Sequence, residues 1–143
     1  NKLENYINSF NNSNRKFQSH EHLAEKNIIS PCLIELNKLN EINEEQFGPI
    51  LHIYKYKASS LKENLIEIND KNYGLTLGIH SRVESKHAEI SALLSAGNAY
   101  VNRDMVGAVV GVQPFGGEGV SGCGLKAGGP NYLLQFVYHY CRF

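Results

Sequence analysis

The sequence has no excess of charge of either sign and no long apolar run. Its 143 residues include 14 basic and 14 acidic side chains, so the formal net charge at pH 7 is zero. Binding to nucleic acid or to an anionic membrane surface through net charge is therefore not expected. The apolar runs are much shorter than the roughly 18 residues that a membrane-spanning helix requires. We therefore expect no transmembrane segment.

Cysteine is scarce as well. The three cysteines, Cys32, Cys123 and Cys141, are odd in number and widely spaced, and no CxxC pair occurs. This pattern excludes a disulfide framework and favours a reducing, cytoplasmic location. His20 and His22 lie in a polar stretch without a neighbouring Cys or Asp. We therefore expect no metal site.

The N-terminal sequence "NKLENYINSF" lacks a basic segment followed by an apolar one, and it has no starting Met. We expect a fragment of a longer chain without a secretory signal.

The remaining composition, 42% hydrophobic and 20% charged, is typical of a globular domain. Periodicity predicts helices in residues 1–10, 59–72, 84–97 and 131–143, with Gly74 and Gly97 ending the second and third. It predicts strands in residues 28–36, 50–56, 75–81 and 98–102, and a loop over 20–27. Helices that alternate with short strands imply crossover connections. We predict one α/β domain, a mainly parallel sheet with flanking helices.

The stretch "NEEQFGPIL", residues 43–51, places two glutamates and Phe47 directly before a strand. A carboxylate there could accept hydrogen bonds from sugar hydroxyls, and the aromatic ring could pack against a ligand ring. In the alternative interpretation, Gly48 and Pro49 form a turn, Phe47 fills the core and the glutamates are solvated. Spacing alone favours this alternative.

The stretch "GVQPFGGEGVSGCG", residues 111–124, contains the spelling GxGxxG from Gly117 to Gly122. Dinucleotide and phosphate sites require this spelling between a strand and a helix N-terminus. Here Glu118 would repel phosphate, and "CGLKAGGP" is not the start of a helix. The glycines instead predict a tightly folded loop whose backbone approaches another group closely.

Two further features lie beside this loop. Gly107 and Ala108 offer consecutive backbone N–H groups with little side chain, which is typical of a nest that binds a carboxylate. Phe115, between Pro114 and Gly116, either fills the core or lines a pocket. Cys123 is a possible nucleophile, but no base nearby in the sequence would activate it.

Together, "EEQFGPIL" and "GNAYVNRDMVGAVVGVQPFGGEGVSGCGLKAGGP", residues 97–130, resemble the aldehyde dehydrogenase superfamily. The strings "GAVVGVQPFGG" and "KAGGP" are similar to its L-glutamate γ-semialdehyde (Δ1-pyrroline-5-carboxylate) dehydrogenase branch, especially the dehydrogenase module of the bifunctional proline utilization A flavoenzymes. The resemblance implies the C-terminal half of an aldehyde dehydrogenase catalytic domain, spanning residues 1–143, that oxidises L-glutamate γ-semialdehyde to L-glutamate in proline catabolism.

The resemblance also implies roles for individual residues. Glu45 matches the glutamate that binds the nicotinamide ribose hydroxyls, and Phe47 matches the aromatic that packs on that part of NAD. Gly107 and Ala108 match the loop whose N–H groups hold the substrate α-carboxylate, and Phe115 matches the aromatic beside its aliphatic chain. NAD is the implied cofactor, with NADP left open. FAD is implied only for an upstream proline dehydrogenase module, if one is present.

The family nucleophile is a cysteine in a G-x-x-C-S/T context upstream of E-x-F-G-P, and no cysteine of this chain has that context. The general base and the NAD-binding half would also lie upstream. We therefore expect no catalytic residue in these 143 residues, no activity of the isolated chain, and self-association or pairing with an N-terminal half. The alternatives are a noncatalytic remnant or assembly domain, and, ranked last, a phosphate-binding module.

Overall fold

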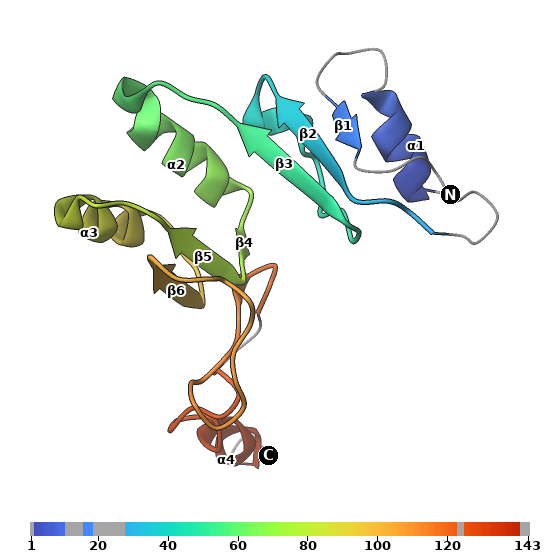
Figure 1. The fold of residues 1–143 in the computed structure, drawn as a ribbon. Coiled ribbons are helices and arrows are strands. Elements are labelled where there is room, and N and C mark those ends of the chain that lie inside the picture. Colours follow the sequence, from blue (N-terminus) through green and yellow to red (C-terminus); the bar gives the residue numbers. More distant parts are fainter. Residues whose placement is uncertain (1, 11–15, 19–27, 123–124, 141–143) are drawn as a thin grey trace. The chain divides into compact units, whose positions relative to one another are not determined.

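The computed structural model describes residues 2–10, 16–18, 28–122 and 125–140. These residues belong to two compact units, Asn1–Ser60 and Leu61–Phe143. Figure 1 labels the main helices and strands of both units. Residues 20–27, where a loop is predicted, and Cys123 and Cys141 lie outside the described residues.

The first unit is a small sheet with one helix. Its elements are α1 (Lys2–Ser9), β1 (Lys16–Gln18), β2 (Cys32–Leu36), η2 (Leu39–Glu41), β3 (Ile50–Tyr54) and η3 (Ala58–Ser60). Strand β2 lies in the middle, antiparallel to β1 and parallel to β3. The parallel register places Cys32 opposite Ile50 and Leu36 opposite Tyr54.

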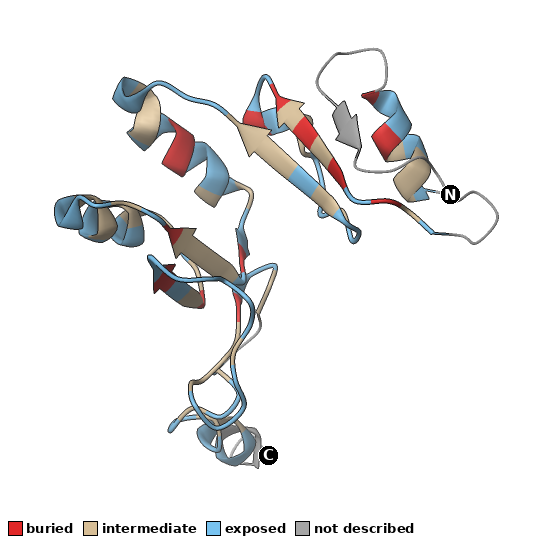
Figure 2. Cartoon of the chain, viewed as in Figure 1, coloured by how far each residue is buried: buried red, intermediate tan, exposed pale blue. Residues whose placement is uncertain are grey.

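The core of the first unit lies between α1 and β2. Alternate residues of β2 are buried, as expected of a strand with one face on a core. Figure 2 shows these buried positions in red. The core cluster comprises Ile7, Phe10, Cys32, Ile34 and Leu36. The period-two pattern of the strand and the helical spacing of Ile7 and Phe10 therefore determine this packing.

A polar contact also joins α1 to β3. The Tyr6 hydroxyl lies 2.8 Å from His52 Nε2, and the Tyr6 ring meets Phe10 edge-on at a centroid distance of 5.4 Å. Partial burial raises the pKa of Tyr6, with a further contribution from the Glu41 carboxylate. Partial burial also lowers the pKa of His52 below its ordinary value of 6.5. The neutral imidazole is thus the form that this packing favours.

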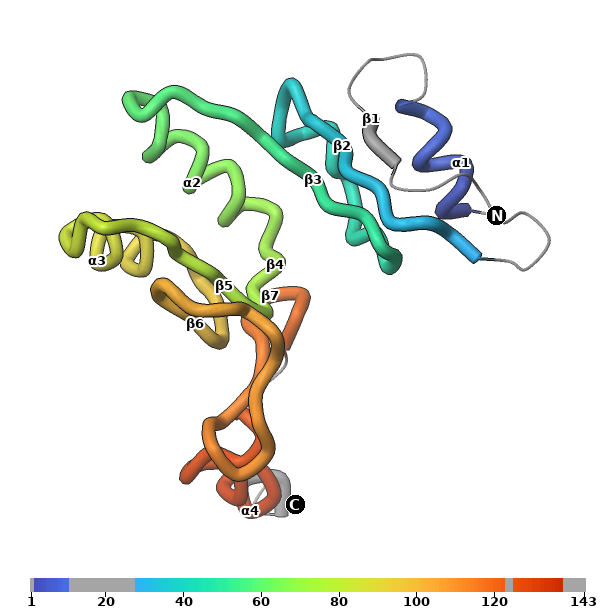
Figure 3. The backbone as a smooth tube through the Cα atoms, viewed as in Figure 1, coloured from blue at the N-terminus to red at the C-terminus, as the bar shows by residue number. Residues whose placement is uncertain are grey.

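The second unit contains α2 (Leu61–Asp70), β4 (Tyr73–Gly74), β5 (Thr76–Ile79), α3 (Glu84–Leu93), β6 (Asn98–Val101), β7 (Glu118–Gly119) and α4 (Leu134–Tyr140). Strands β5 and β6 are parallel, with α3 between them in the chain, which is a βαβ connection. Strands β4 and β7 are antiparallel. In Figure 3 the chain leaves β6 as a long excursion and returns to β7 beside β4.

The α/β class, the four helices and the predicted strands are confirmed, as is a parallel pairing across a helix, that of β5 with β6 across α3. Strands β2 and β3 are also parallel, with only the short η2 between them. The strands, however, form three small sheets among the described residues rather than one. Strands β1, β4 and β7 were not predicted, because they are too short to show a periodicity.

The predicted glycine helix ends are wrong for a physical reason. Helix α2 ends at Asp70, and Asn72 takes the left-handed conformation at φ 59° while Gly74 pairs in β4. Asparagine is the side chain that best tolerates this conformation after glycine. Gly97 follows α3 by several residues, and a Cβ there would overlap the carbonyl oxygen of Gly116. This glycine serves close backbone contact rather than helix termination.

Candidate functional site

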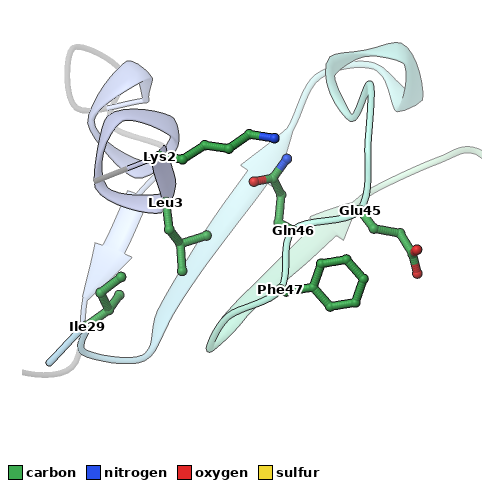
Figure 4. A pocket seen from close by; sticks show the side chains of 6 residues that line it. All are labelled: Lys2, Leu3, Ile29, Glu45, Gln46 and Phe47. Atoms are coloured by element: carbon green, nitrogen blue, oxygen red, sulfur yellow. The ribbon is translucent and has the colours of Figure 1, made fainter. Parts of the chain in front are cut away.

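Glu45 and Phe47 line an open pocket in the first unit. Its volume is about 360 Å³, and its walls are Lys2, Leu3, Ile29, Glu45, Gln46 and Phe47. Figure 4 shows the Phe47 ring beneath Gln46, with the Glu45 carboxylate pointing away from Lys2. An apolar wall with a carboxylate at its rim suits a ligand that carries both a ring and hydroxyl groups.

A tight turn projects Phe47 outward. Within the turn, Ile50 N–H donates to the Gly48 carbonyl at 2.8 Å. From β2, Cys32 N–H donates to the Pro49 carbonyl of the turn at 2.9 Å. A Cβ on Gly48 would overlap the Leu3 side chain, so α1 packs directly on the turn. The Phe47 side chain is 86% exposed. The interpretation in which Phe47 fills the core of this chain is therefore wrong.

The charges beside this pocket leave Glu45 without a cation. Lys2 Nζ pairs instead with Glu44 Oε1 at 2.8 Å. This hydrogen-bonded ion pair lowers the pKa of the Glu44 carboxyl. No cation among the described residues pairs with Glu45, which is exposed. The Glu45 oxygens are thus available as hydrogen-bond acceptors.

The second unit holds Phe115 by its backbone on both sides. Phe115 N–H donates to the Ala127 carbonyl and Ala127 N–H donates back to the Phe115 carbonyl, each at 3.0 Å. The Asn98 side chain binds the two flanking residues, donating from Nδ2 to the Pro114 carbonyl at 2.9 Å and accepting at Oδ1 from Gly116 N–H at 3.4 Å. The half-buried Phe115 ring is therefore carried on a fixed backbone.

Gly107 and Ala108 lie on the same excursion between β6 and β7. The buried Tyr100 donates its hydroxyl proton to the Gly107 carbonyl at 3.1 Å and accepts from Gln113 Nε2 at 2.9 Å. Gly107 has a φ of 39°, which only glycine adopts without strain. Of the described residues, none accepts a hydrogen bond from Ala108 N–H. Ala108 N–H is thus an available donor, and the carboxylate nest stays a prediction.

The five predicted site residues belong to two groups. Glu45 and Phe47 line one pocket of the first unit, and Gly107, Ala108 and Phe115 share one segment of the second. Asn98 and Tyr100 were not predicted as site residues. Their signal was available in "NAYVN", because residues two apart on a strand face the same side and this strand leads directly into the site segment.

Three N–H groups of the glycine-rich stretch donate to backbone carbonyls of the second unit. Val120 N–H donates to Asn72, Ser121 N–H to Glu118 and Gly122 N–H to Gly119. A Cβ at Gly122 would overlap the backbone of Gly117, so the segment closes on itself. Tight backbone contact thus accounts for these glycines without a phosphate.

Other chemistries have little support in the described ranges. Cys32 is 5% exposed in the core of the first unit, so solvent and substrate have little access to it. Among the described residues, no cluster of His, Cys, Asp or Glu has the arrangement that a metal ion needs. None of the helices in these ranges is both long enough and apolar enough to cross a bilayer.

Comparison with known proteins gives a consistent result. Bifunctional protein PutA of Salmonella typhimurium is 52% identical over 112 residues, which cover 78% of this chain and 8% of the relative. Human mitochondrial Delta-1-pyrroline-5-carboxylate dehydrogenase is 38% identical over 115 residues, which cover 77% of this chain and 20% of the relative. A mutant proline utilization A from Bradyrhizobium japonicum superposes with a TM-score of 0.84 at 43% identity, covering 94% of this chain and 14% of that structure.

The chain therefore spans a small part of the relatives it matches. The model of the aldehyde dehydrogenase family matches residues 1–140, nearly the whole sequence. This match includes both the Glu45–Phe47 pocket and the segment from Gly107 to Phe115. The chain belongs to the aldehyde dehydrogenase family.

Proposed function

We propose that this chain is the C-terminal part of an NAD-dependent dehydrogenase that oxidises L-glutamate γ-semialdehyde to L-glutamate. The observation that carries the proposal is that one segment, between β6 and β7, contains both the available Ala108 N–H and Phe115, whose backbone is fixed. A carboxylate suits the N–H group, and a short methylene chain suits the phenyl ring. The names of the Salmonella typhimurium and human relatives agree with this substrate.

The pocket of the first unit fits the nicotinamide riboside end of NAD. The exposed Phe47 ring offers an apolar face, and the unpaired Glu45 carboxylate offers acceptors for ribose hydroxyls. When bound, NAD accepts the hydride of the aldehyde. In this proposal Glu45 and Phe47 orient the cofactor, and Gly107, Ala108 and Phe115 orient the substrate. The choice between NAD and NADP does not involve these residues.

We further propose that residues 1–143 are part of one catalytic domain and are covered by the remainder of that domain or by a second copy. Four valines beside the site are 63–98% exposed: Val106, Val109, Val110 and Val112. Such a group of apolar side chains is typical of an interaction surface. Size-exclusion chromatography with light scattering tests this surface. A dimer or larger species supports it, and a monodisperse monomer counts against coverage by a second copy.

A hybrid enzyme tests the proposed function. This chain replaces the segment that it matches in the Salmonella typhimurium PutA, and reduction of NAD is measured with glutamate semialdehyde. We expect a rate within about tenfold of the unmodified host, because 52% identity preserves the packing surfaces. The isolated chain, which has no cysteine in the nucleophile context, should not reduce NAD.

Two results would contradict the proposal. One is a folded hybrid that binds NAD but does not oxidise the semialdehyde. The other is turnover by the isolated chain, which would mean that the assignment of its cysteines is wrong. A noncatalytic remnant or assembly domain predicts the first result.

A further inference from the structure

Tyr100 links two distant points of the substrate segment to the interior of the second unit. Its side chain is 6% exposed on β6. The Tyr100 hydroxyl donates to the Gly107 carbonyl at 3.1 Å and accepts from Gln113 Nε2 at 2.9 Å. Both hydrogen-bonding functions of the phenol are therefore satisfied by residues of this segment.

The segment has few other internal supports. Gly107 and Gly111 have φ values of 39° and 80°, and Val110 is 98% exposed. Figure 2 shows the chain after β6 mostly in the colour of exposed residues. One backbone hydrogen bond, from Val112 N–H to Val109, closes a turn within it. Exposed glycine-containing backbone of this kind is mobile unless a contact fixes it.

The Tyr100 bond acts on the peptide group that carries the available donor. The Gly107 carbonyl and Ala108 N–H belong to one peptide unit, and no cis peptide bond occurs among the described residues. In a trans peptide the C=O and N–H bonds point in opposite directions. Holding the Gly107 oxygen on the Tyr100 hydroxyl therefore directs Ala108 N–H away from β6.

A second effect reinforces the first. A hydrogen bond accepted by a carbonyl polarises the peptide and strengthens its own N–H as a donor. The Tyr100 ring is itself held in place, because the Arg103 guanidinium lies 4.8 Å from the ring centroid. The ring and its hydroxyl thus present a fixed donor to a flexible glycine peptide.

We propose that Tyr100 is a positioning residue that orients Ala108 N–H toward the α-carboxylate of the substrate, an inference that rests on the proposed function. Tyr100 touches neither the aldehyde nor the cofactor in this account. Its removal should weaken binding of the carboxylate without changing the hydride transfer step. A purely structural tyrosine would affect every substrate alike.

The first test uses the full 143-residue chain labelled with ¹⁵N. We expect the backbone order parameter of Ala108 to be near about 0.85, as in rigid backbone, and to fall below about 0.6 in Tyr100→Phe. Tyr73→Phe, the same chemical change on β4, is the matched control and should leave Ala108 unchanged. Equal order parameters of Ala108 in the parent and in Tyr100→Phe would overturn the proposal.

The second test uses the hybrid enzyme and two aldehydes. Glutamate semialdehyde carries the α-carboxylate, and 4-aminobutanal is the same molecule without it. We expect Tyr100→Phe to raise KM for glutamate semialdehyde by about threefold to tenfold, the effect of one neutral hydrogen bond. The kcat of this variant, and its KM for 4-aminobutanal, should remain within about twofold of the values of the unmodified hybrid. Gln113→Leu keeps the bond between Tyr100 and Gly107 and should have a smaller effect.

Equal changes in KM for both aldehydes, or no change for either, would contradict the role of Tyr100. Failure of the proposed function gives a different result, in which the unmodified hybrid does not oxidise glutamate semialdehyde or does not distinguish it from 4-aminobutanal. The order parameter of Ala108 still decides in that case whether Tyr100 fixes the peptide.

Discussion

The Asn98 side chain holds Phe115 through the backbone of the two residues that flank it. The Asn98 amide donates to the carbonyl of Pro114 and accepts from the N–H of Gly116, the residues on either side of Phe115. The distances are 2.9 and 3.4 Å. A strand residue therefore fixes the backbone from which the site aromatic projects.

Asn98→Ala should destabilise the second unit by about 1–3 kcal/mol, because the Pro114 carbonyl and the Gly116 N–H lose a partner in a partly buried place. Asn98→Asp keeps an acceptor for Gly116 N–H, so its stability should lie between those of the parent and Asn98→Ala. Urea unfolding measures the difference. Asn131→Ala, at an exposed position of the same unit, is the control. Equal stability of Asn98→Ala and the control would contradict the coupling.

Two glycines should respond differently to the same added methyl group. A Cβ at Gly97 would overlap the Gly116 carbonyl, so Gly97→Ala should cost about 3 kcal/mol through overpacking of the backbone. Gly111 has a φ of 80° and open space around it, so Gly111→Ala should cost about 1 kcal/mol. Thermal unfolding of both variants measures the order. The reverse order would mean that Gly97 does not lie close to the Gly116 carbonyl.

Phe47 and Phe10 provide a contrast between an exposed aromatic, for which we propose a binding role, and a core aromatic. Phe10 is 8% exposed and Phe47 is 86% exposed. Phe10→Ala should cost about 3–5 kcal/mol, whereas Phe47→Ala should change stability by less than about 0.5 kcal/mol. In the hybrid enzyme, Phe47→Ala should instead raise KM for NAD. A large loss of stability, with KM unchanged, would assign Phe47 to folding.

The contact between Tyr6 and His52 predicts a dependence on pH. Burial lowers the pKa of His52 in the folded chain, so the unfolded chain binds more protons once the pH falls below 6.5. The stability of the first unit should be fully present above that value and decrease as the pH falls toward the folded pKa. Urea unfolding at about pH 7 and pH 5 measures the decrease.

His52→Gln, which cannot titrate, should remove much of that dependence, and the exposed His80→Gln should retain it. If His52→Gln and the parent lose stability equally over this range, another group is responsible.

The sequence predicted most of the fold where periodicity was strong. The alternation in "CLIEL" and the helical stripe of "LKENLIEI" correspond to β2 and α2. Strands such as β4 and β7 have two residues each and exist because their partners are adjacent, which no local pattern records. The role of Gly97 was missed for the same reason, since it depends on Gly116.

The candidate site was predictable only in part. The residues proposed to contact ligand, such as Phe47 and Phe115, stood out because apolar side chains in loops are conspicuous. Asn98 and Tyr100, which hold the segment between β6 and β7, did not stand out, because they look like ordinary members of a short strand. Their hydrogen bonds run to residues 7 to 18 positions away. Spacing alone carries no information about such pairs.

The central claim is that Ala108 N–H binds the α-carboxylate of the substrate. The most direct measurement is the ratio of kcat/KM for glutamate semialdehyde to that for 4-aminobutanal, in the hybrid enzyme and in its Ala108→Pro variant, which lacks that N–H. We predict that the ratio falls by about tenfold or more, because a charge-assisted hydrogen bond is lost for one aldehyde only. An unchanged ratio in a folded variant that still binds NAD would contradict the account.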